Sequence, residues 1–273
     1  MDNPEQLSPP LRPAGHIALA TGVACGVTDV GLVRRTNQDN FCIASHLGLL
    51  AVADGMGGHE GGEIASRDAL RLLCSYLLDA RSGPAGDPDA TWPGAAATAA
   101  GRLLAAIEFA NAQIYAANVA RQHADGTGMG TTLTGMWQPA PQGPAFIFHV
   151  GDSRLYCWRD GAMAQLTRDQ TLYQQALDLG APEPLPPRNL LLQALGPTAA
   201  VRPELMTRAV APGDVYLLCS DGLYGDSAPQ AIAEILARAG DDNLDACCAE
   251  LLALARRDGG RDNITALLLR CRE

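Results

Sequence analysis

Five aspartates lie where apolar, strand-like runs meet loops, although they are far apart in the sequence. They are Asp39, Asp54, Asp152, Asp221 and Asp262. Carboxylates at neighbouring strand ends suit hard, oxygen-preferring divalent ions such as Mg²⁺ or Mn²⁺ rather than zinc. If Asp54 bridges two such ions, the ions can share and acidify one water molecule. The natural reaction of such a centre is in-line attack of water on phosphorus.

The segment Leu49–His59 carries the most information of any single stretch. An apolar run stops at Asp54, and three glycines and a histidine follow within five residues. Glycine-rich backbone lets a metal, a water molecule or a phosphate approach closely. Because an Asp-Gly pair alone usually marks only a turn, the interpretation depends on the other four carboxylate-bearing segments.

Length and composition restrict the possible functions. The chain has 273 residues, of which 47% are apolar and 18% charged, so we expect one large domain with a sizeable core. The net charge of -10 argues against a nucleic-acid or anionic-membrane surface, since both need clustered basic residues. All 20 basic residues are arginine, which excludes a phosphate-binding P-loop lysine, a kinase lysine and a Schiff base.

The eight cysteines form no Cys-x-x-Cys pair and lie mostly in apolar runs. This pattern predicts reduced core thiols of a cytoplasmic protein. No cysteine has an arginine six positions later, so the loop of thiol-based phosphatases is absent. The apolar stretch Ile17–Val27 also allows a signal peptide, but the preceding segment is acidic and Gly22 occupies the place of a large aliphatic residue in a lipoprotein signal.

Hydrophobic periodicity and turn residues divide the chain into strands and helices. Because the two kinds of element are segregated rather than alternating, the expected fold class is α+β. The expected strands are Ile17–Thr28, Asn40–Ala44, Gly48–Ala53, Thr131–Trp137, Ala145–Val150, Leu155–Arg159, Val215–Cys219 and Ile264–Arg270, and the expected helices are Glu60–Leu78, Leu103–Ala117, Pro229–Ala239 and Leu244–Arg257.

We expect a flexible tail at residues 1–15 and one catalytic domain at residues 16–273. The loop Arg81–Gly94 is rich in proline, glycine and aspartate and should lie at the surface. The pair Asp160-Gly161 predicts a two-residue hairpin turn. Residues 167–197 contain five prolines and one short helical piece. An irregular segment of this length inside a compact domain is typically functional, and we call residues 167–197 the flap.

Six motifs follow one another along residues 20 to 270. They are Val33–Asp39, Asp54–His59, Gly130-Thr131-Thr132, Gly151-Asp152-Ser153-Arg154, Ser220-Asp221-Gly222-Leu223 and Asp262-Asn263-Ile264-Thr265. With these motifs in this order, the chain resembles the metal-dependent protein phosphatase 2C family of Ser/Thr phosphatases in its bacterial form. The resemblance implies a central antiparallel β-sandwich flanked by helices on both sides.

The resemblance also assigns metal ligands. It implies two core Mn²⁺ or Mg²⁺ ions, with Asp54 bridging them, the Gly55 carbonyl on the first ion, and Asp221 and Asp262 on the second. Asp152 is similar to the ligand of a third, weaker metal in bacterial members, where it is shared with Asp221.

Three more residues take roles around the ions. Asp39 is expected to hold metal-bound waters from outside the ligand set. Arg34 matches the phosphate-binding arginine, whose planar guanidinium can grip two phosphate oxygens. His59 is the candidate general acid that protonates the leaving oxygen. Two departures from the family pattern are Gln38, where many relatives carry glutamate, and Gln170, which replaces a histidine at the start of the flap.

These observations predict a cytoplasmic phosphoprotein phosphatase that hydrolyses phosphoserine and phosphothreonine by direct water attack. Its expected partners are phosphoprotein substrates and a bacterial Ser/Thr kinase, with no nucleic acid and no membrane, and the chain is expected to be a monomer. An alternative is a catalytically silent regulator of the same fold that binds phosphoproteins. Another is a phosphatase dedicated to one regulator, as in sporulation. A purely structural β-sandwich would leave the five aspartates unexplained.

Overall fold

The computed structural model describes residues 15–57, 61–79 and 95–272. Three expectations from the sequence therefore concern residues outside the described part. These are the general acid His59, the loop Arg81–Gly94 and all but the last residue of the N-terminal tail.

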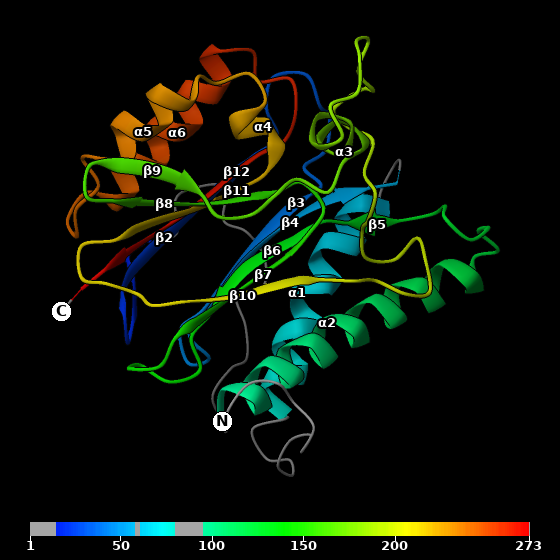
Figure 1. Cartoon of the computed structure of the whole chain (residues 1–273), viewed down its shortest axis with the longest axis horizontal. Helices are drawn as coiled ribbons and strands as arrows, with labels where there is room; N and C mark the ends of the chain where they lie inside the picture. The colour runs from blue at the N-terminus through cyan, green and yellow to red at the C-terminus, as the bar shows by residue number, and fades with distance from the viewer. Residues whose placement is uncertain (1–14, 58–60, 80–94, 273) are drawn as a thin grey trace.

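Two antiparallel sheets stack face to face at the centre of the molecule (Figure 1). The first sheet contains, in spatial order, β1 (Ile17–Leu19), β2 (Gly22–Asp29), β12 (Ile264–Cys271), β11 (Val215–Cys219), β8 (Arg154–Arg159) and β9 (Ala162–Gln165). The second contains β10 (Glu204–Arg208), β7 (Ala145–Val150), β6 (Leu133–Trp137), β4 (Leu49–Met56) and β3 (Asp39–Ala44), with the short β5 (Gly130–Thr131) paired to β4.

Helices cover the outer face of each sheet (Figure 1). The pair α1 (Gly61–Asp79) and α2 (Ala95–Ala120) packs on the second sheet, and α4 (Asp221–Tyr224), α5 (Pro229–Leu236) and α6 (Leu244–Arg257) pack on the first. The flap contributes α3 (Leu172–Asp178). None of the described helices is long and apolar enough to cross a membrane. The four-layer arrangement confirms the α+β sandwich that the sequence predicts.

The packing explains why several strands are apolar throughout rather than alternating. In β11, Tyr216 and Leu218 point into the core between the two sheets. Val215, Leu217 and Cys219 point the other way, into the core beneath the helices. Successive side chains of a strand face opposite sides, so a strand with helices on one side and a second sheet on the other has to be apolar on both faces.

Two strand assignments from the sequence need correction. The run Ile17–Thr28 is not one strand but the hairpin β1–β2, which turns at residues 20–21 with Leu19 opposite Gly22. No turn-forming pair marks this bend, so the apolar run hides it. Strand β10 is missing from the prediction because it is an edge strand whose residues are mostly exposed, and such a strand has no continuous apolar pattern.

The hairpin between β8 and β9 is confirmed. Asp160 and Gly161 both have positive φ, 53° and 82°, as a tight two-residue turn requires.

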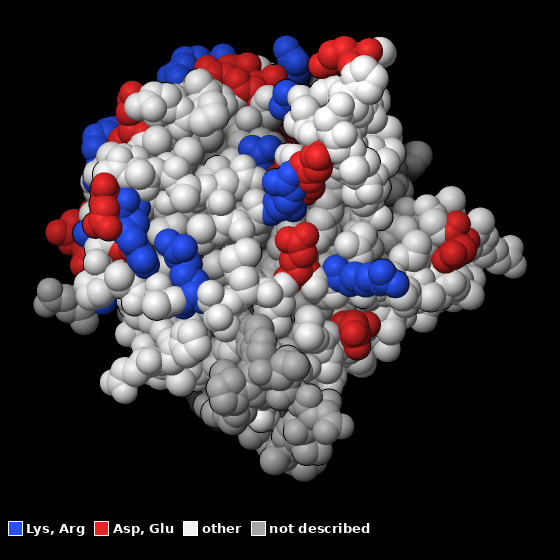
Figure 2. Space-filling model, viewed as in Figure 1, with Lys and Arg blue, Asp and Glu red and all other residues white. Residues whose placement is uncertain are grey.

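Charged side chains of both signs are interspersed over the face shown in Figure 2, so that face offers a polyanion no continuous basic surface.

Candidate active site

The structure brings the five aspartates together although they come from both sheets. Asp39 and Asp54 are directly opposite each other in β3 and β4. Asp221 and Asp262 flank the neighbouring strands β11 and β12 of the other sheet, and Asp152 follows β7. Partial removal from water raises the pKa of Asp54 well above its usual value, and the nearby carboxylates of Asp39, Asp221, Asp152 and Asp262 raise it further. The carboxylates of the cluster therefore repel one another, and a cation among them would relieve that repulsion.

Asp39 connects the two sheets. Its Oδ2 accepts hydrogen bonds from Ser220 Oγ at 2.6 Å and from Thr265 Oγ1 at 2.8 Å. Its Oδ1 is buried without a hydrogen-bond partner. Burial raises the pKa of Asp39 to about 7, although the two hydroxyl donors oppose the shift. A carboxylate held on one side and open on the other can orient water next to the cluster.

The residues present fit a divalent cation. Asp221 Oδ1, like Asp39 Oδ1, is a buried oxygen without a hydrogen-bond partner in the described structure. Removal from water and the neighbouring Asp262 raise the pKa of Asp221 to about 6. Unpaired buried carboxylate oxygens are costly, and a hard cation satisfies several of them at once.

Among the described residues, no group of three or more acidic, histidine or cysteine side chains is arranged so that it could hold a metal ion by itself. An all-protein cage is not what Mg²⁺ requires, because it usually keeps several waters and binds one or two carboxylates. A loose cluster with open carboxylate oxygens is consistent with ions that are partly hydrated.

Arg34 reaches the cluster from the loop before β3. Its Nη2 donates to Asp262 Oδ2 at 2.6 Å, and just over half of its side chain (53%) is exposed. The hydrogen bond to Asp262 raises the pKa of Arg34, and the charges of Asp262, Asp221 and Asp54 act in the same direction. The guanidinium thus lies at the solvent side of the cluster.

Asp152 lies in the turn after β7 and is 8% exposed. Burial raises its pKa to about 7, and Asp221 and Asp169 contribute to the shift. The flap contacts this turn directly. The side-chain oxygen Oε1 of Gln170 accepts a hydrogen bond from the backbone amide of Gly151 at 2.9 Å. The backbone amide of Gln170 donates to the Gly151 carbonyl at 2.8 Å. The glutamine that departs from the family pattern therefore docks the flap beside Asp152.

A close backbone contact fixes the start of α1 against Asp54. A Cβ on Gly55 would lie 2.1 Å from the Gly62 carbonyl oxygen, and a Cβ on Gly62 would lie 2.7 Å from the Gly55 carbonyl carbon. Only glycine permits this approach at both positions. The glycines around Asp54 therefore seat α1, besides leaving room for a ligand.

Hydroxyl and amide side chains that the sequence interpretation did not assign hold the aspartates. The Asp54 amide donates to Thr132 Oγ1 at 2.9 Å, and Thr131 Oγ1 donates to the Asp54 carbonyl at 3.0 Å. Asn263 bridges the loop that carries Arg34, since it donates to the Thr36 carbonyl at 2.9 Å. These residues lie within the motifs named above. Their position next to an aspartate is therefore the feature of the sequence that could have identified them.

Comparison with known proteins agrees with this geometry. A helix-covered β-sandwich with a carboxylate cluster at its strand ends is the architecture expected of a metal-dependent phosphatase. The model of the Protein phosphatase 2C family matches residues 33–267, and the chain belongs to this family. The family and the fold predicted from the sequence are confirmed.

Three relatives illustrate the match. The serine/threonine protein phosphatase PstP of Mycobacterium tuberculosis is 38% identical over 246 residues, which are 88% of this chain but 43% of PstP. This chain thus spans less than half of that relative. The serine/threonine phosphatase stp of Listeria innocua is 33% identical over 89% of this chain and 93% of its own. The solved catalytic domain of PstP in complex with two manganese ions superposes with a TM-score of 0.74 at 33% identity, covering 92% of this chain and 98% of that domain.

Proposed function

We propose that the chain is a metal-dependent protein-serine/threonine phosphatase that removes phosphate from phosphoserine and phosphothreonine by direct attack of water. The carboxylate cluster carries this proposal, because Asp39 and Asp221 each keep a buried oxygen open and Arg34 borders the same cluster. The named relatives are Ser/Thr phosphatases, which supports the same activity here.

The ligand assignment is part of the proposal. Asp54, the Gly55 carbonyl, Asp221 and Asp262 hold two Mn²⁺ or Mg²⁺ ions, and Asp152 with Asp221 holds a third. The two manganese ions in the PstP domain support the two core sites and favour manganese. When bound, such ions supply positive charge that acidifies water and offsets the charge of the phosphate.

The remaining residues act on phosphate, water and leaving group. Arg34 releases one contact with Asp262 and grips the phosphate through its guanidinium, where charge builds up during attack. Asp39 uses its open oxygen to hold water in place. His59 donates the proton to the departing serine or threonine oxygen.

The partners and setting are also proposed. Phosphoproteins are the substrates, and a Ser/Thr kinase whose products this chain reverses is the functional partner in a bacterial signalling pathway. The chain acts as a monomer in the cytoplasm. None of the eight cysteines, all of which lie in the described part of the chain, is joined in a disulfide, which suits a reducing compartment.

Phosphopeptides of one sequence bearing phosphoserine, phosphothreonine or phosphotyrosine test the activity. With Mn²⁺ present, we expect phosphate release from the first two peptides, little from the third, and none from any of them in excess chelator. A silent regulator would instead retain the phosphothreonine peptide in a binding assay without releasing phosphate, and that result would replace the proposed activity.

A further inference from the structure

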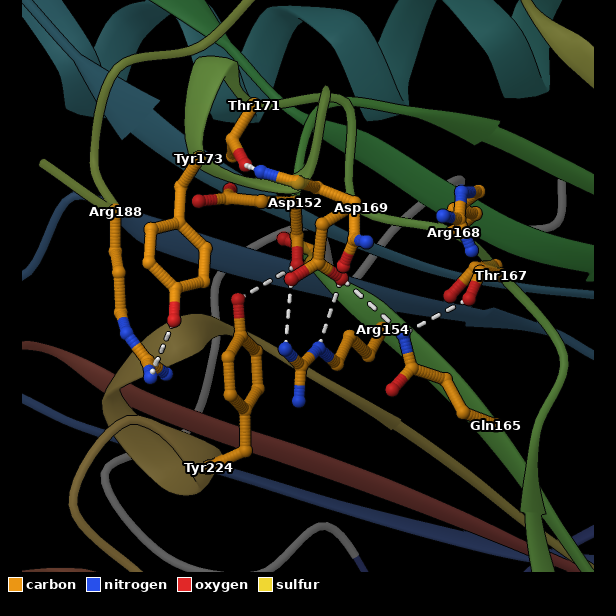
Figure 3. Close-up of polar contacts among 12 residues, drawn as sticks. Asp152, Arg154, Gln165, Thr167, Arg168, Asp169, Thr171, Tyr173, Arg188 and Tyr224 are labelled. Carbon is orange, nitrogen blue, oxygen red and sulfur yellow. Dashed lines mark hydrogen bonds and ion pairs between the residues drawn. The ribbon is translucent and has the colours of Figure 1, made fainter. Parts of the chain in front are cut away.

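Arg154 joins the turn of Asp152 to the flap by a two-point ion pair. It is the first residue of β8, two positions after Asp152. Its Nε and Nη2 donate to the two carboxylate oxygens of Asp169 at 2.8 and 2.6 Å (Figure 3). The side chains are only 20% and 11% exposed, so water screens this pair less than a surface pair. Asp169 precedes Gln170, which docks on Gly151.

The same guanidinium holds the helix that begins with Asp221. Its central carbon lies 3.6 Å from the centre of the Tyr224 ring, at the last residue of α4. The Tyr224 hydroxyl in turn donates to the Asp152 carbonyl at 2.8 Å. Tyr224 thus connects helix α4, which begins with Asp221, to the turn that carries Asp152. The guanidinium of Arg154 stacks on the ring of Tyr224 (Figure 3).

Arginine is the residue that can make all these contacts at once. Its planar fork matches both oxygens of Asp169, its face packs on Tyr224, and its remaining nitrogen Nη1 donates to the Tyr156 hydroxyl at 2.9 Å. A lysine would keep the charge but lose the two-point geometry and the stacking. Because these contacts engage all three nitrogens and one face of the guanidinium, Arg154 is committed to these structural contacts rather than to the phosphate.

The contacts of Arg154 oppose an electrostatic repulsion between two carboxylates of the cluster. Asp152 is buried near the like-charged Asp221, whereas the positive charge of Arg154 lies close enough to offset that of Asp152. Two carboxylates that repel each other move apart unless the backbone that carries them is held. Residues that orient metal ligands from outside the ligand set commonly change metal affinity by about 10- to 100-fold when they are mutated.

We infer that Arg154 is a positioning residue, which through Tyr224 and Asp169 locks the Asp152 turn, the Asp221 helix and the start of the flap together and so sets the metal affinity of the Asp152–Asp221 pair. This inference rests on the proposed function, because it assumes that this pair binds a divalent ion.

Calorimetric titration with Mn²⁺ tests the inference in Arg154→Lys and Tyr224→Phe. Arg159→Lys is the matched control, because Arg159 is at the other end of β8 and makes a similar two-point contact with Asp214. We expect the weakest Mn²⁺ site to lose about tenfold or more in affinity in Arg154→Lys, and a smaller but measurable factor in Tyr224→Phe, which loses only the hydroxyl contact to Asp152. Arg159→Lys should bind like the wild type, even where its thermal midpoint falls as much as that of Arg154→Lys.

Unchanged affinity of the weakest site in Arg154→Lys, or an equal loss in Arg159→Lys, overturns the inference while leaving the proposed function in place. If Arg154→Lys does not fold, Tyr224→Phe decides, and binding within twofold of the wild type overturns the inference. A wild-type protein that binds no Mn²⁺ overturns the inference and the proposed function together.

Discussion

At the scale of single residues, the site depends on carboxyl groups that are withdrawn from water and lie close to one another. Asp39, Asp152 and Asp221 have raised pKa values because each is withdrawn from water and lies beside other carboxylates. The sequence predicts which aspartates meet, because each lies near a junction of a strand and a loop within a quoted motif. It does not show the hydroxyls of Ser220 and Thr265 that hold Asp39, since those contacts join residues that are 181 and 226 positions apart in the sequence.

Replacing Arg34 by glutamine should lower kcat/KM for a phosphothreonine peptide by about 10²- to 10³-fold, the range seen when one charge-stabilising donor is removed. Arg35→Gln is the matched control, because Arg35 is also exposed and the proposal assigns it no role. Steady-state kinetics of the three proteins provide the comparison. Equal losses in the two variants would show that the effect is one of general surface charge.

His59→Ala should slow hydrolysis of a phosphothreonine peptide more than hydrolysis of an aryl phosphate. The phenolic leaving group needs less protonation, so loss of a general acid matters less for it. The ratio of the two rates is the measurement, and His123→Ala, at an exposed position, is the control. If both substrates slow to the same extent, the acid is another group.

At the scale of elements, most strand and helix positions follow from periodicity. Strand β11 and helix α6 begin and end at the predicted residues. The predictions fail where the pattern carries no signal, at the unmarked turn between β1 and β2 and at the exposed edge strand β10. The contact of Gly55 with Gly62 is also invisible in the sequence, because it depends on how α1 docks on β4.

Gly62→Ala should reduce the free energy of unfolding by about 1–3 kcal/mol, the usual cost of forcing extra atoms into a packed contact. The added methyl group would meet the Gly55 backbone and the Gln38 side chain at less than 3 Å. Gly101→Ala is the control, since nothing lies within 4 Å of its added Cβ, and it should stabilise α2 by about 0.5–1 kcal/mol. Urea unfolding measures both changes. Equal stability of the two variants would contradict the proposed seating of α1.

The flap should control substrate choice. Arg188 ties its two halves together through the Tyr173 hydroxyl at 3.1 Å (Figure 3), and its prolines limit backbone freedom. Exchanging residues 167–197 for the corresponding segment of a relative should change the preference among phosphoproteins and leave aryl phosphate turnover unchanged. An unchanged preference would argue against this role.

At the scale of the whole molecule, the two sheets bring carboxylates from distant parts of the chain to one edge. The free energy that this arrangement costs the folded protein depends on pH. A carboxyl group whose pKa is raised on folding retains protons that the unfolded chain releases. Such a group destabilises the folded protein as the pH rises above the unfolded pKa. The raised values of about 7, 7 and 6 for Asp39, Asp152 and Asp221 against a usual 3.8 place this loss between about pH 4 and pH 7.

In chelator, the thermal midpoint of the wild type should therefore fall relative to that of Asp221→Asn as the pH rises from 4.5 to about 7.5. Mn²⁺ should raise the wild-type midpoint more at pH 7.5 than at pH 5, because protons compete with the metal for the same oxygens. Differential scanning fluorimetry across this range measures both effects. Parallel curves for the two proteins would contradict the pKa shifts.

The most direct test of the central claim is the initial rate of phosphate release from a phosphothreonine peptide as a function of Mn²⁺ concentration. The comparison includes the wild type, Asp54→Asn, Asp221→Asn and the hairpin variant Asp160→Asn. We predict that the rate in Asp54→Asn and Asp221→Asn falls by at least about 10²-fold at every Mn²⁺ concentration, since each loses a ligand of the reacting centre. Asp160→Asn should match the wild type, because asparagine suits the same turn. Equal rates in all four proteins would contradict a metal centre built on these aspartates.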